Sequence, residues 1–321
     1  MTAHKPYLLQ LTKLPILVEE TQTRLNRHYR VLLADTPEAL KTALKQHGAE
    51  IELVVTSAMT PTPASLIEQL PALKAICSVG VGYDSIDIQA AKKQSVVVSN
   101  TPDVLNDCVA DMAFGLILAT MRGIGSAERY VRRGAWTDRL AGLPLGSRVS
   151  GKKLGIVGLG RIGTEIAQRA SGFRMPVRYH NRRQRDDVNY PYEASLQQLA
   201  QWADILVIAT VGGAQTHQLI NHTILQALGP EGVIVNIARG SVIDQDALIT
   251  ALETGQIAGA GLDVYVNEPH VPERLKQLEN VVLLPHIASA THETREDMLR
   301  LMLDNVESFA QHGRLITPVN D

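Results

Sequence analysis

The sequence is poor in cysteine and in aromatic residues, and it has no excess of either charge. Its two cysteines, Cys77 and Cys108, are too few for a disulfide scaffold and lack the close spacing of a zinc site. Aromatic residues make up 4% and the formal net charge is −2, unlike the basic surfaces of nucleic-acid-binding proteins. We therefore expect a protein of a reducing compartment, the cytoplasm, that binds neither nucleic acid nor a metal.

Long apolar runs are also absent. No stretch reaches the roughly 18 consecutive apolar residues that a membrane span requires. At the N-terminus, Lys13 and Pro15 interrupt the apolar residues, and there is no basic start followed by a clean apolar run as in a secretory signal. The sequence thus predicts a soluble chain without a membrane partner.

Short apolar runs rich in β-branched residues alternate with amphipathic stretches along most of the chain. Such runs are typical of strands buried on both faces of a parallel sheet, with helices between them. The predicted strands fall into two series, 30–35, 51–57, 73–80 and 95–100, then 153–160, 177–181, 204–210, 233–239, 258–264 and 281–287.

The two series predict two α/β domains, because 321 residues exceed the usual size of one domain. Helical patterns occupy 37–48, 104–124 and 293–313, whereas 127–153 is broken by glycine, proline and charge. The pattern places a boundary near residue 101 and leaves open which domain receives the last helix.

A glycine motif opens the second series. Gly158, Gly160 and Gly163 stand in GxGxxG spacing, after the predicted strand "KLGIV" and at the start of the helical pattern "RIGTEIAQRA". The first glycine permits a tight turn, the second lets a pyrophosphate approach the backbone, and the third allows close packing of helix on strand. Free N–H groups at the helix start favour an anion. This setting predicts dinucleotide binding.

Basic residues follow the next predicted strand, "VRYHN". NAD-binding proteins often place an acidic residue about twenty positions beyond the glycines, where it binds the ribose hydroxyls. That position is the neutral Asn181 in this chain, and Arg182, Arg183 and Arg185 follow it. Arginines bind a 2′-phosphate that an acid would repel, so the sequence favours NADP over NAD. The alternative is a solvated basic turn that accepts either cofactor.

Three candidate catalytic residues lie at or beyond predicted strands of the second series. They are Arg239 in "IARGSVID", Glu268 in "GLDVYVNEP" and His286 in "LLPHIASAT". Ligands of parallel sheets bind at the carboxyl ends of the strands. Each residue alone has a simpler interpretation: Arg239 as part of a surface ion pair, Glu268 as a turn residue and His286 as a structural histidine. Together an arginine for a carboxylate and a histidine oriented by an acid suit hydride transfer to a 2-oxo acid.

A string of segments resembles the motifs of one enzyme family, in order and over nearly the whole chain. The segments are "SVGVGYDSID", "NTPDVLNDCVADMAFGLILA", "LGIVGLGRIG", "VNIARGSVIDQDAL", "GAGLDVYVNEP" and "LLPHIASATHETR". On them the chain is identified as a member of the D-isomer-specific 2-hydroxyacid dehydrogenases. Because of "TPDVLNDCVADMA" and "HNRR" it is most similar to the glyoxylate and hydroxypyruvate reductases of that family. The resemblance implies NADPH-dependent reduction of glyoxylate or hydroxypyruvate to the D-2-hydroxy acid.

The resemblance also implies a fold with two doubly wound parallel-sheet domains. A Rossmann nucleotide-binding domain would occupy 102–286. A flavodoxin-like substrate domain would combine 1–101 with 287–321, so that the last helix returns to the first domain. A cleft between two such domains can close over the substrate and exclude water.

The family assigns the chemistry to matching positions. His286 would give its proton to the substrate carbonyl oxygen, and Glu268 would pair with His286 and stabilise its cationic form. Arg239 would hold the substrate carboxylate and the carbonyl oxygen. The complete set expected around the substrate is the backbone of Val81 and Gly82 together with Arg239, Ser289, Met59 and Trp136.

The cofactor would contact a wider set of positions. Arg161 and Ile162 would cover the pyrophosphate, and Asp263 would lie at the amide side of the nicotinamide. Asn106 stands where the family more often has threonine, and its amide could still reach a cofactor phosphate. The complete set expected around the cofactor is Gly158, Gly160, Arg161, Ile162, Gly163, Asn181, Arg182, Arg183, Thr210, Val211, Ala238, Asp263 and Asn106.

Trp136 lies in the segment "VRRGAW", inside the irregular stretch 127–153. Local packing is the ordinary explanation for its ring. In similar reductases this arm belongs to a dimer interface, and a tryptophan reaches the neighbouring active site. The resemblance therefore implies a homodimer in which Trp136 contacts substrate in the other subunit.

Other activities on the same scaffold stay open at this point. A 2-ketogluconate, phosphoglycerate or phosphite dehydrogenase would share most motifs, and Ala58 and Met59 in "TSAMTPTP" permit several substrates. A formate-type enzyme has glutamine as the partner of its histidine, and Glu268 argues against it. A nucleotide-sensing corepressor-like protein can keep the catalytic residues, but the extensions expected of one are missing.

Overall fold

The computed structural model describes residues 5–138 and 142–320, and the chain in it divides into two compact units. Unit 1 combines Met1–Leu105 with Ala290–Asp321, and unit 2 is Asn106–Ser289. The predicted boundaries at 101 and 287 lie shortly before these limits. Residues 1–4 of the N-terminal stretch and 139–141 of the stretch 127–153 lie outside the described residues.

Unit 1 is built on a five-stranded parallel sheet with the order β2-β1-β3-β4-β5. This is the flavodoxin-like order, in which the chain reverses direction across the sheet between β1 and β3. The elements of unit 1 are β1 (Tyr7–Gln10), α1 (Val18–His28), β2 (Arg30–Leu33), α2 (Pro37–His47), a 3-10 turn (Gly48–Glu50), β3 (Ile51–Ser57), α3 (Ala64–Ile67), β4 (Ala75–Val79), α4 (Ile88–Lys93), β5 (Val97–Ser99) and α12 (His292–His312).

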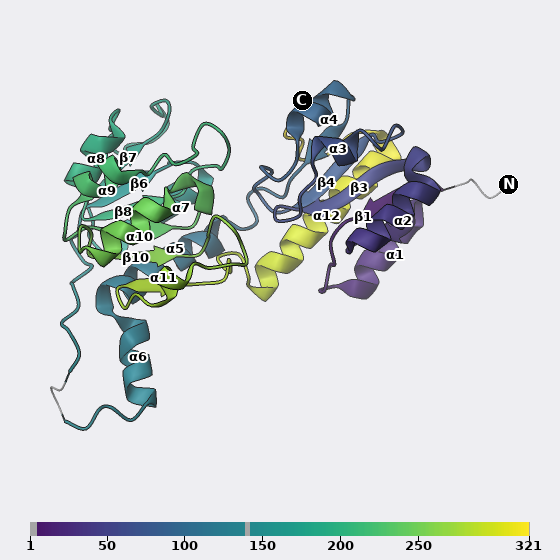
Figure 1. Cartoon of the computed structure of the whole chain (residues 1–321). Coiled ribbons are helices and arrows are strands. Elements are labelled where there is room, and N and C mark those ends of the chain that lie inside the picture. Colours follow the sequence, from purple (N-terminus) through teal and green to yellow (C-terminus); the bar gives the residue numbers. More distant parts are fainter. Residues whose placement is uncertain (1–4, 139–141, 321) are drawn as a thin grey trace. The chain divides into compact units, whose positions relative to one another are not determined.

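Alternate residues of the central strand β1 serve opposite cores, as the two-residue repeat of a strand requires. Tyr7 and Leu9 pack with side chains of α2, α3 and α4. Leu8 packs on the other face with side chains of α1 and α12, among them Leu25 and Met302. Figure 1 shows α12, in yellow, against the purple and blue elements of unit 1. The last helix therefore covers one face of the first sheet.

Unit 2 is built on a six-stranded parallel sheet with the order β11-β10-β9-β8-β6-β7. Since β7 lies on one side of β6 and β8 on the other, the sheet has a switch point at the carboxyl end of β6. The elements of unit 2 are α5 (Asn106–Arg122), α6 (Ile124–Arg132), β6 (Leu154–Val157), α7 (Arg161–Gly172), β7 (Val177–His180), α8 (Leu196–Trp202), β8 (Ile205–Ile208), α9 (His222–Leu228), β9 (Val233–Asn236), a 3-10 turn (Gly240–Val242), α10 (Gln245–Glu253), β10 (Gly259–Leu262), α11 (Glu273–Lys276) and β11 (Val281–Leu283).

The predicted fold class, two doubly wound α/β units with parallel sheets, is confirmed by this topology. Three elements lie where the sequence predicted none. The strand β1 has four residues, and its central place depends on pairing with β2 and β3 rather than on its own pattern. The helix α1 precedes β2. The helix α6 begins directly after Gly123, whose φ of 60° separates it from α5, so the first part of 127–153 is helical.

Within the described residues, no single helix has the length and apolar character to cross a membrane. The pair α5 and α6 meets the criterion only when the two are joined across a bend of 64°. The apolar side chains of α5 that are buried, such as Phe114, Leu116 and Ile117, belong to the interior of unit 2.

An ion-pair cluster joins α1 to α12 in unit 1. Arg24 donates from Nε to Glu307 Oε1 at 3.0 Å and from Nη2 to Glu307 Oε2 at 2.7 Å, and it also donates to Asp304 at 2.6 Å. These hydrogen bonds and the charge of Arg24 hold the pKa of Glu307 below its ordinary value of 4.5. The first and last helices of unit 1 are thus linked by a bidentate pair, which is stronger than a single contact.

Replacing Arg24 tests this link through the pH dependence of stability. A carboxylate with a lowered folded pKa contributes stability above the ordinary pKa of 4.5 and loses it as pH falls through the folded value. We expect Arg24→Met to lower the free energy of unfolding by about 1 kcal/mol at pH 7, with the difference shrinking below pH 4.5. Denaturant unfolding at several pH values measures it, with the more exposed Arg300→Met as control. A difference independent of pH would contradict this account.

Candidate active site

The glycine motif forms the turn from β6 into α7. Gly158 has a φ of +99°, and a Cβ there would lie 2.6 Å from the backbone nitrogen of Thr210. A Cβ at Gly163 would lie 2.2 Å from the carbonyl oxygen of Gly158. Around Gly160, by contrast, no heavy atom lies within 4 Å of the Cβ position. Two glycines therefore permit close packing, and the third leaves open space before the N–H groups of α7.

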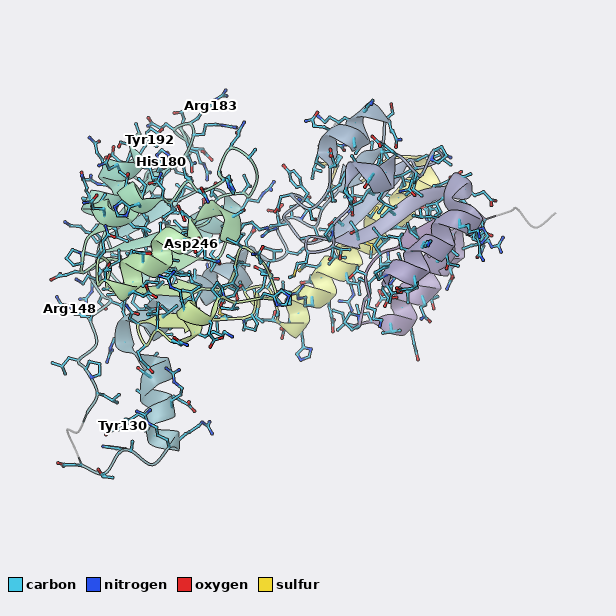
Figure 2. The ribbon with its side chains drawn as sticks, viewed as in Figure 1. Tyr130, Arg148, His180, Arg183, Tyr192 and Asp246 are labelled. Atoms are coloured by element: carbon cyan, nitrogen blue, oxygen red, sulfur yellow. The ribbon has the colours of Figure 1, made fainter. Side chains whose placement is uncertain are left out.

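A pocket of about 680 Å³ lies at the carboxyl ends of β6, β7 and β8. Among its lining residues are seven predicted cofactor residues, Gly158, Gly160, Asn181, Arg182, Arg183, Thr210 and Val211. A second hollow of about 610 Å³ shares Gly160 and Asn181 with it and adds Arg161 and Asn106. Figure 2 labels His180 and Arg183, which line the first pocket, at one end of unit 2. The space beside the glycine turn suits a dinucleotide, which this fold binds at the switch point.

Both ends of the basic turn 181–185 are anchored. The Asn181 side chain accepts a hydrogen bond from Leu159 N–H at 2.7 Å, so it holds the glycine turn. Arg185 donates to Leu159 O at 2.9 Å and to Thr164 Oγ1 at 3.0 Å, and it forms a bidentate pair with Asp187. That pairing raises the pKa of Arg185 and lowers the pKa of Asp187. Arg185 is therefore engaged in the turn itself.

Arg182 and Arg183 are the arginines of this turn that line the pocket. Arg182 donates to Gln215 Oε1 at 2.5 Å, which links the turn after β7 to the segment after β8. Arg183 is exposed and has no hydrogen-bond partner among the described residues. The two guanidinium groups give this side of the pocket a positive charge.

His286 and Glu268 form a close pair beyond the ends of β10 and β11. His286 Nδ1 lies 2.7 Å from Glu268 Oε2, and Glu268 Oε1 accepts a hydrogen bond from Tyr265 N–H at 2.9 Å. Burial alone would raise the pKa of Glu268, but hydrogen bonds from His286 and Tyr265, with the charges of His286 and Arg239, hold it below its ordinary value. Glu268 is thus a carboxylate near neutral pH, and its partner has Nε2 left for another group.

Asp263 binds the backbone of His286 and of the two residues that follow it. Its side chain is fully buried, and its two carboxylate oxygens accept hydrogen bonds from Ile287 N–H and Ala288 N–H, both at 2.8 Å. Its carbonyl oxygen accepts from His286 N–H at 2.9 Å. Burial raises the pKa of Asp263, and the two N–H donors and the charge of His286 offset that effect in part. His286 has a φ of 54°, a conformation that these three hydrogen bonds stabilise.

Arg239 follows β9 on a backbone segment pressed against the loop of Glu268. A Cβ at the next residue, Gly240, would lie 1.9 Å from the carbonyl carbon of Tyr265, so glycine is required for this approach. The buried Asn236 fixes the turn by accepting from Ala238 N–H at 3.0 Å and donating to the Arg239 carbonyl at 3.0 Å. Arg239 itself is half-buried. Arg239, Glu268 and His286 thus lie on the segments that follow the parallel strands β9, β10 and β11 of unit 2.

The remaining predicted residues lie in several places. Val81, Gly82 and Met59 belong to unit 1, where Met59 is exposed on the loop after β3 and the other two follow β4. Ile162 lies in the first turn of α7, and Ala238 is buried after β9. Ser289 is half-buried at the end of unit 2, and Trp136 is 63% exposed beyond α6.

Four residues that shape these sites were not predicted. His180 directly precedes Asn181 and lines the pocket, and its position at a strand end was a usable signal. Gln215 lies in a glycine-containing turn after β8. Asn100, within the motif "NTP", binds the carbonyl of Val81. The Tyr265 hydroxyl donates to Leu284 O at 3.0 Å, a contact for which the sequence carries no signal.

The described residues, 5–138 and 142–320, contain no group of three or more His, Cys, Asp or Glu side chains placed to bind one metal ion.

Comparison with known proteins gives a family for the whole chain. Residues 114–288 match the model of the D-isomer specific 2-hydroxyacid dehydrogenase, NAD binding domain. A hydroxyphenylpyruvate reductase of Plectranthus scutellarioides is 43% identical over 298 residues, 93% of this chain and 95% of that protein. A glyoxylate/hydroxypyruvate reductase A of Arabidopsis thaliana shows the same identity and coverage.

A solved structure matches equally broadly. It is the NADPH-dependent glyoxylate/hydroxypyruvate reductase of Sinorhizobium meliloti in complex with NADP and malonate, at a TM-score of 0.91 and 38% identity. The match covers 98% of this chain and 97% of that one. The resemblance seen in the sequence motifs is thereby confirmed. The chain belongs to the D-isomer-specific 2-hydroxyacid dehydrogenase family and is an oxidoreductase that uses a nicotinamide cofactor.

Proposed function

We propose that the chain reduces a small 2-oxo acid, glyoxylate or hydroxypyruvate, to the D-2-hydroxy acid with NADPH. The observation that supports this most is the 2.7 Å contact between His286 Nδ1 and Glu268 Oε2. A histidine held through one ring nitrogen by a carboxylate can give a proton from the other. The named activities of the relatives from Arabidopsis and Sinorhizobium support the choice of substrate.

In the proposed reaction a bound nicotinamide supplies the hydride. The Glu268 carboxylate stabilises the protonated, cationic ring of His286, which then gives its Nε2 proton to the substrate carbonyl oxygen as negative charge develops there. Arg239 holds the substrate carboxylate and polarises the carbonyl oxygen through its guanidinium N–H groups. Asp263 fixes His286 and is proposed to lie at the amide side of the nicotinamide.

Further substrate contacts are proposed in each unit separately. In unit 1 the N–H groups of Val81 and Gly82 bind the carboxylate, and the exposed Met59 limits substrate size. In unit 2 Ser289 contacts the substrate, and Trp136 reaches the substrate of a second subunit.

The cofactor is proposed to follow the pocket beside the glycine turn. The open space at Gly160 and the close packing at Gly158 and Gly163 fit a pyrophosphate on the N–H groups of Arg161 and Ile162. Arg182 and Arg183 bind the 2′-phosphate, and Asn181 holds the turn beneath it. The other proposed contacts are Thr210 and Val211 at the adenosine, Asn106 at a phosphate and Ala238 at the nicotinamide half.

The pairing of His286 with Glu268 predicts a change in the pH profile of Glu268→Gln. The pKa of Glu268 is held below 4.5, so its carboxylate stays ionised until pH falls through that lowered value. An amide can accept the hydrogen bond but cannot stabilise a positive charge. We expect kcat/KM at pH 7 to fall about 100-fold and the alkaline limb of activity to move to lower pH.

Steady-state rates from about pH 5 to about pH 9 measure this effect, because that range spans the ordinary titration of a histidine. Glu273→Gln is the matched control, since Glu273 pairs with Lys276 on α11. A Glu268→Gln enzyme with the wild-type profile would remove Glu268 from the mechanism.

Initial rates with NADPH and NADH test the cofactor and the substrate together. Glyoxylate, hydroxypyruvate and 2-ketogluconate are assayed in parallel. We expect turnover of one of the two smaller acids with a strong preference for NADPH, because Arg182 and Arg183 complement a 2′-phosphate. No turnover with any of the three acids would overturn the proposed function.

The double variant Arg182→Ser, Arg183→Ser isolates the contribution of the two arginines. We expect the KM for NADPH to rise about 100-fold and that for NADH to change little, because NADH lacks the 2′-phosphate. Arg274→Ser is the control, since Arg274 pairs with Glu253 and does not line the pocket. Equal effects on both cofactors would mean that these side chains support the turn rather than the phosphate.

A homodimer is proposed on the apolar surface around α6. Val131 is 55% exposed, Trp136 63% and Leu145 100%, and α6 extends away from the sheet of unit 2 (Figure 1). Tyr130, labelled in Figure 2, packs near Gly142 and so ties the described part of the returning segment to α6. Large apolar side chains that are exposed on one chain are often covered at an interface.

Charge placed on this surface tests the dimer. We expect Val131→Glu with Leu145→Glu to convert a dimer into a monomer, because burying two unpaired carboxylates costs several kcal/mol. Light scattering after size-exclusion chromatography measures the mass, and the exposed Ile316→Glu of unit 1 is the control. A wild-type chain that is monomeric, or a double variant that stays dimeric, would refute this interface.

A further inference from the structure

Two successive peptide groups after β4 are held by their carbonyl oxygens. The Gly80 carbonyl accepts a hydrogen bond from Thr101 N–H at 2.9 Å. The Val81 carbonyl accepts from Asn100 Nδ2 at 2.8 Å. Gly80 N–H in turn donates to Thr101 Oγ1 at 2.9 Å. The short segment 100–101 therefore grips the chain at both peptides that carry the N–H groups of Val81 and Gly82.

This grip sets the direction of those N–H groups. In a trans peptide the C=O and the N–H point in opposite directions. Each of the two peptides has its carbonyl turned toward Asn100 and Thr101, so its N–H is turned away from them. Among the described residues none accepts a hydrogen bond from Val81 N–H or Gly82 N–H. Two adjacent unpaired N–H groups make a site for an anion.

The geometry of Gly80 leaves little freedom in this segment. Its φ is +124°, and a Cβ there would lie 2.6 Å from Ala58 Cβ. Ala58 N–H also donates to the Val79 carbonyl at 2.9 Å, so the loop after β3 packs on the same turn. The backbone up to Gly80 is thus fixed by packing, whereas the Val81–Gly82 peptide depends on the single donor from Asn100.

We propose that Asn100 is a positioning residue for the substrate carboxylate. It acts through the Val81 carbonyl, by aiming and polarising the Gly82 N–H that lies on the opposite side of the same peptide. The inference rests on the proposed function, in which the Val81 and Gly82 N–H groups bind that carboxylate. Without the amide of Asn100 the peptide can rotate, and the anion loses one of its two aligned donors.

Asn100 is itself held by the segment that follows α12. Thr317 Oγ1 donates to the Asn100 carbonyl at 2.6 Å. The fully buried Asn305 of α12 accepts from Ile316 N–H and Thr317 N–H at 2.9 and 3.0 Å. Substrate affinity in unit 1 therefore depends on a chain of contacts from α12 through Thr317 to Asn100.

The same region offers a matched control in Asn320. Its amide pairs with backbone at the start of β5, accepting from Val98 N–H at 2.7 Å and donating to the carbonyl of the preceding Val96 at 2.9 Å. Asn320 is 8% exposed and Asn100 7%. Both are buried asparagines that bind backbone at the same edge of unit 1, but only Asn100 contacts the Val81–Gly82 peptide.

The experiment compares Asn100→Ala with Asn320→Ala in the full-length chain. Calorimetry gives the Kd of malonate, a carboxylate probe, in the presence of NADP, and steady-state rates give KM and kcat with glyoxylate. We expect Asn100→Ala to raise the malonate Kd and the KM about tenfold, with kcat and the Kd of NADPH changed less than twofold. We expect Asn320→Ala to lower the melting temperature and to leave both carboxylate constants unchanged.

Each outcome decides between the two proposals. If the wild type turns over a 2-oxo acid but Asn100→Ala keeps its malonate Kd, the positioning role is wrong and the proposed function stands. If Asn320→Ala weakens malonate as much as Asn100→Ala, the effect is one of general stability and the positioning role is also wrong. If the wild type has no turnover but loses malonate affinity in Asn100→Ala, the positioning role stands and the proposed reaction fails.

A second pair of variants provides the test if the Asn100→Ala chain does not fold. Thr317→Val removes the hydroxyl that holds the Asn100 carbonyl, and Thr317→Ser keeps it. We expect Thr317→Val to raise the malonate Kd about threefold and Thr317→Ser to restore it, because one neutral hydrogen bond contributes little more than that. Equal malonate affinity in the two Thr317 variants would overturn the link from α12 to the carboxylate site.

Discussion

The two hydrogen bonds from the Ile287 and Ala288 N–H groups to the Asp263 carboxylate are the interaction on which the site in unit 2 depends. They hold His286 in a left-handed backbone conformation that a non-glycine residue adopts only under constraint. Because Asp263 directly follows the strand β10, the orientation of His286 is set by the sheet rather than by a mobile loop. Glu268 then has only to fix the ring, and its own place is secured by the backbone of Tyr265.

In both units a buried polar side chain forms hydrogen bonds to the backbone and thereby orients a polar group of the site. In unit 2 the side chain of Asp263 grips N–H groups and so aims a side chain. In unit 1 the side chain of Asn100 grips a carbonyl and so leaves an N–H unpaired on the other side. A short side chain that is buried next to a strand end loses little conformational entropy when it forms these hydrogen bonds. Such sites are rigid before any ligand binds, which is the condition for strong electrostatic effects.

The sequence predicted those features that depend on position along a strand. The glycine turn, Arg239 and His286 all lie where an apolar run ends, and parallel strands bring such ends to one edge. It did not predict β1, whose four residues become a central strand only through pairing. Nor did it predict that Arg185 turns inward to Leu159 while Arg183 stays exposed. The partners of long charged side chains are determined by tertiary contacts, which the local sequence pattern does not show.

The return of α12 to unit 1 has a consequence for the order in which the chain folds during synthesis. The face of the first sheet that carries Leu8 and Leu53 is covered by α12, which is made only after the whole of unit 2. Unit 2 is continuous and can fold as soon as it emerges, because domains fold as units. Unit 1 stays incomplete for that time, with an apolar sheet face open to other nascent chains. The second unit in the sequence is therefore the first that can reach its final form, and the core of the N-terminal strands is completed only when the last helix has been made.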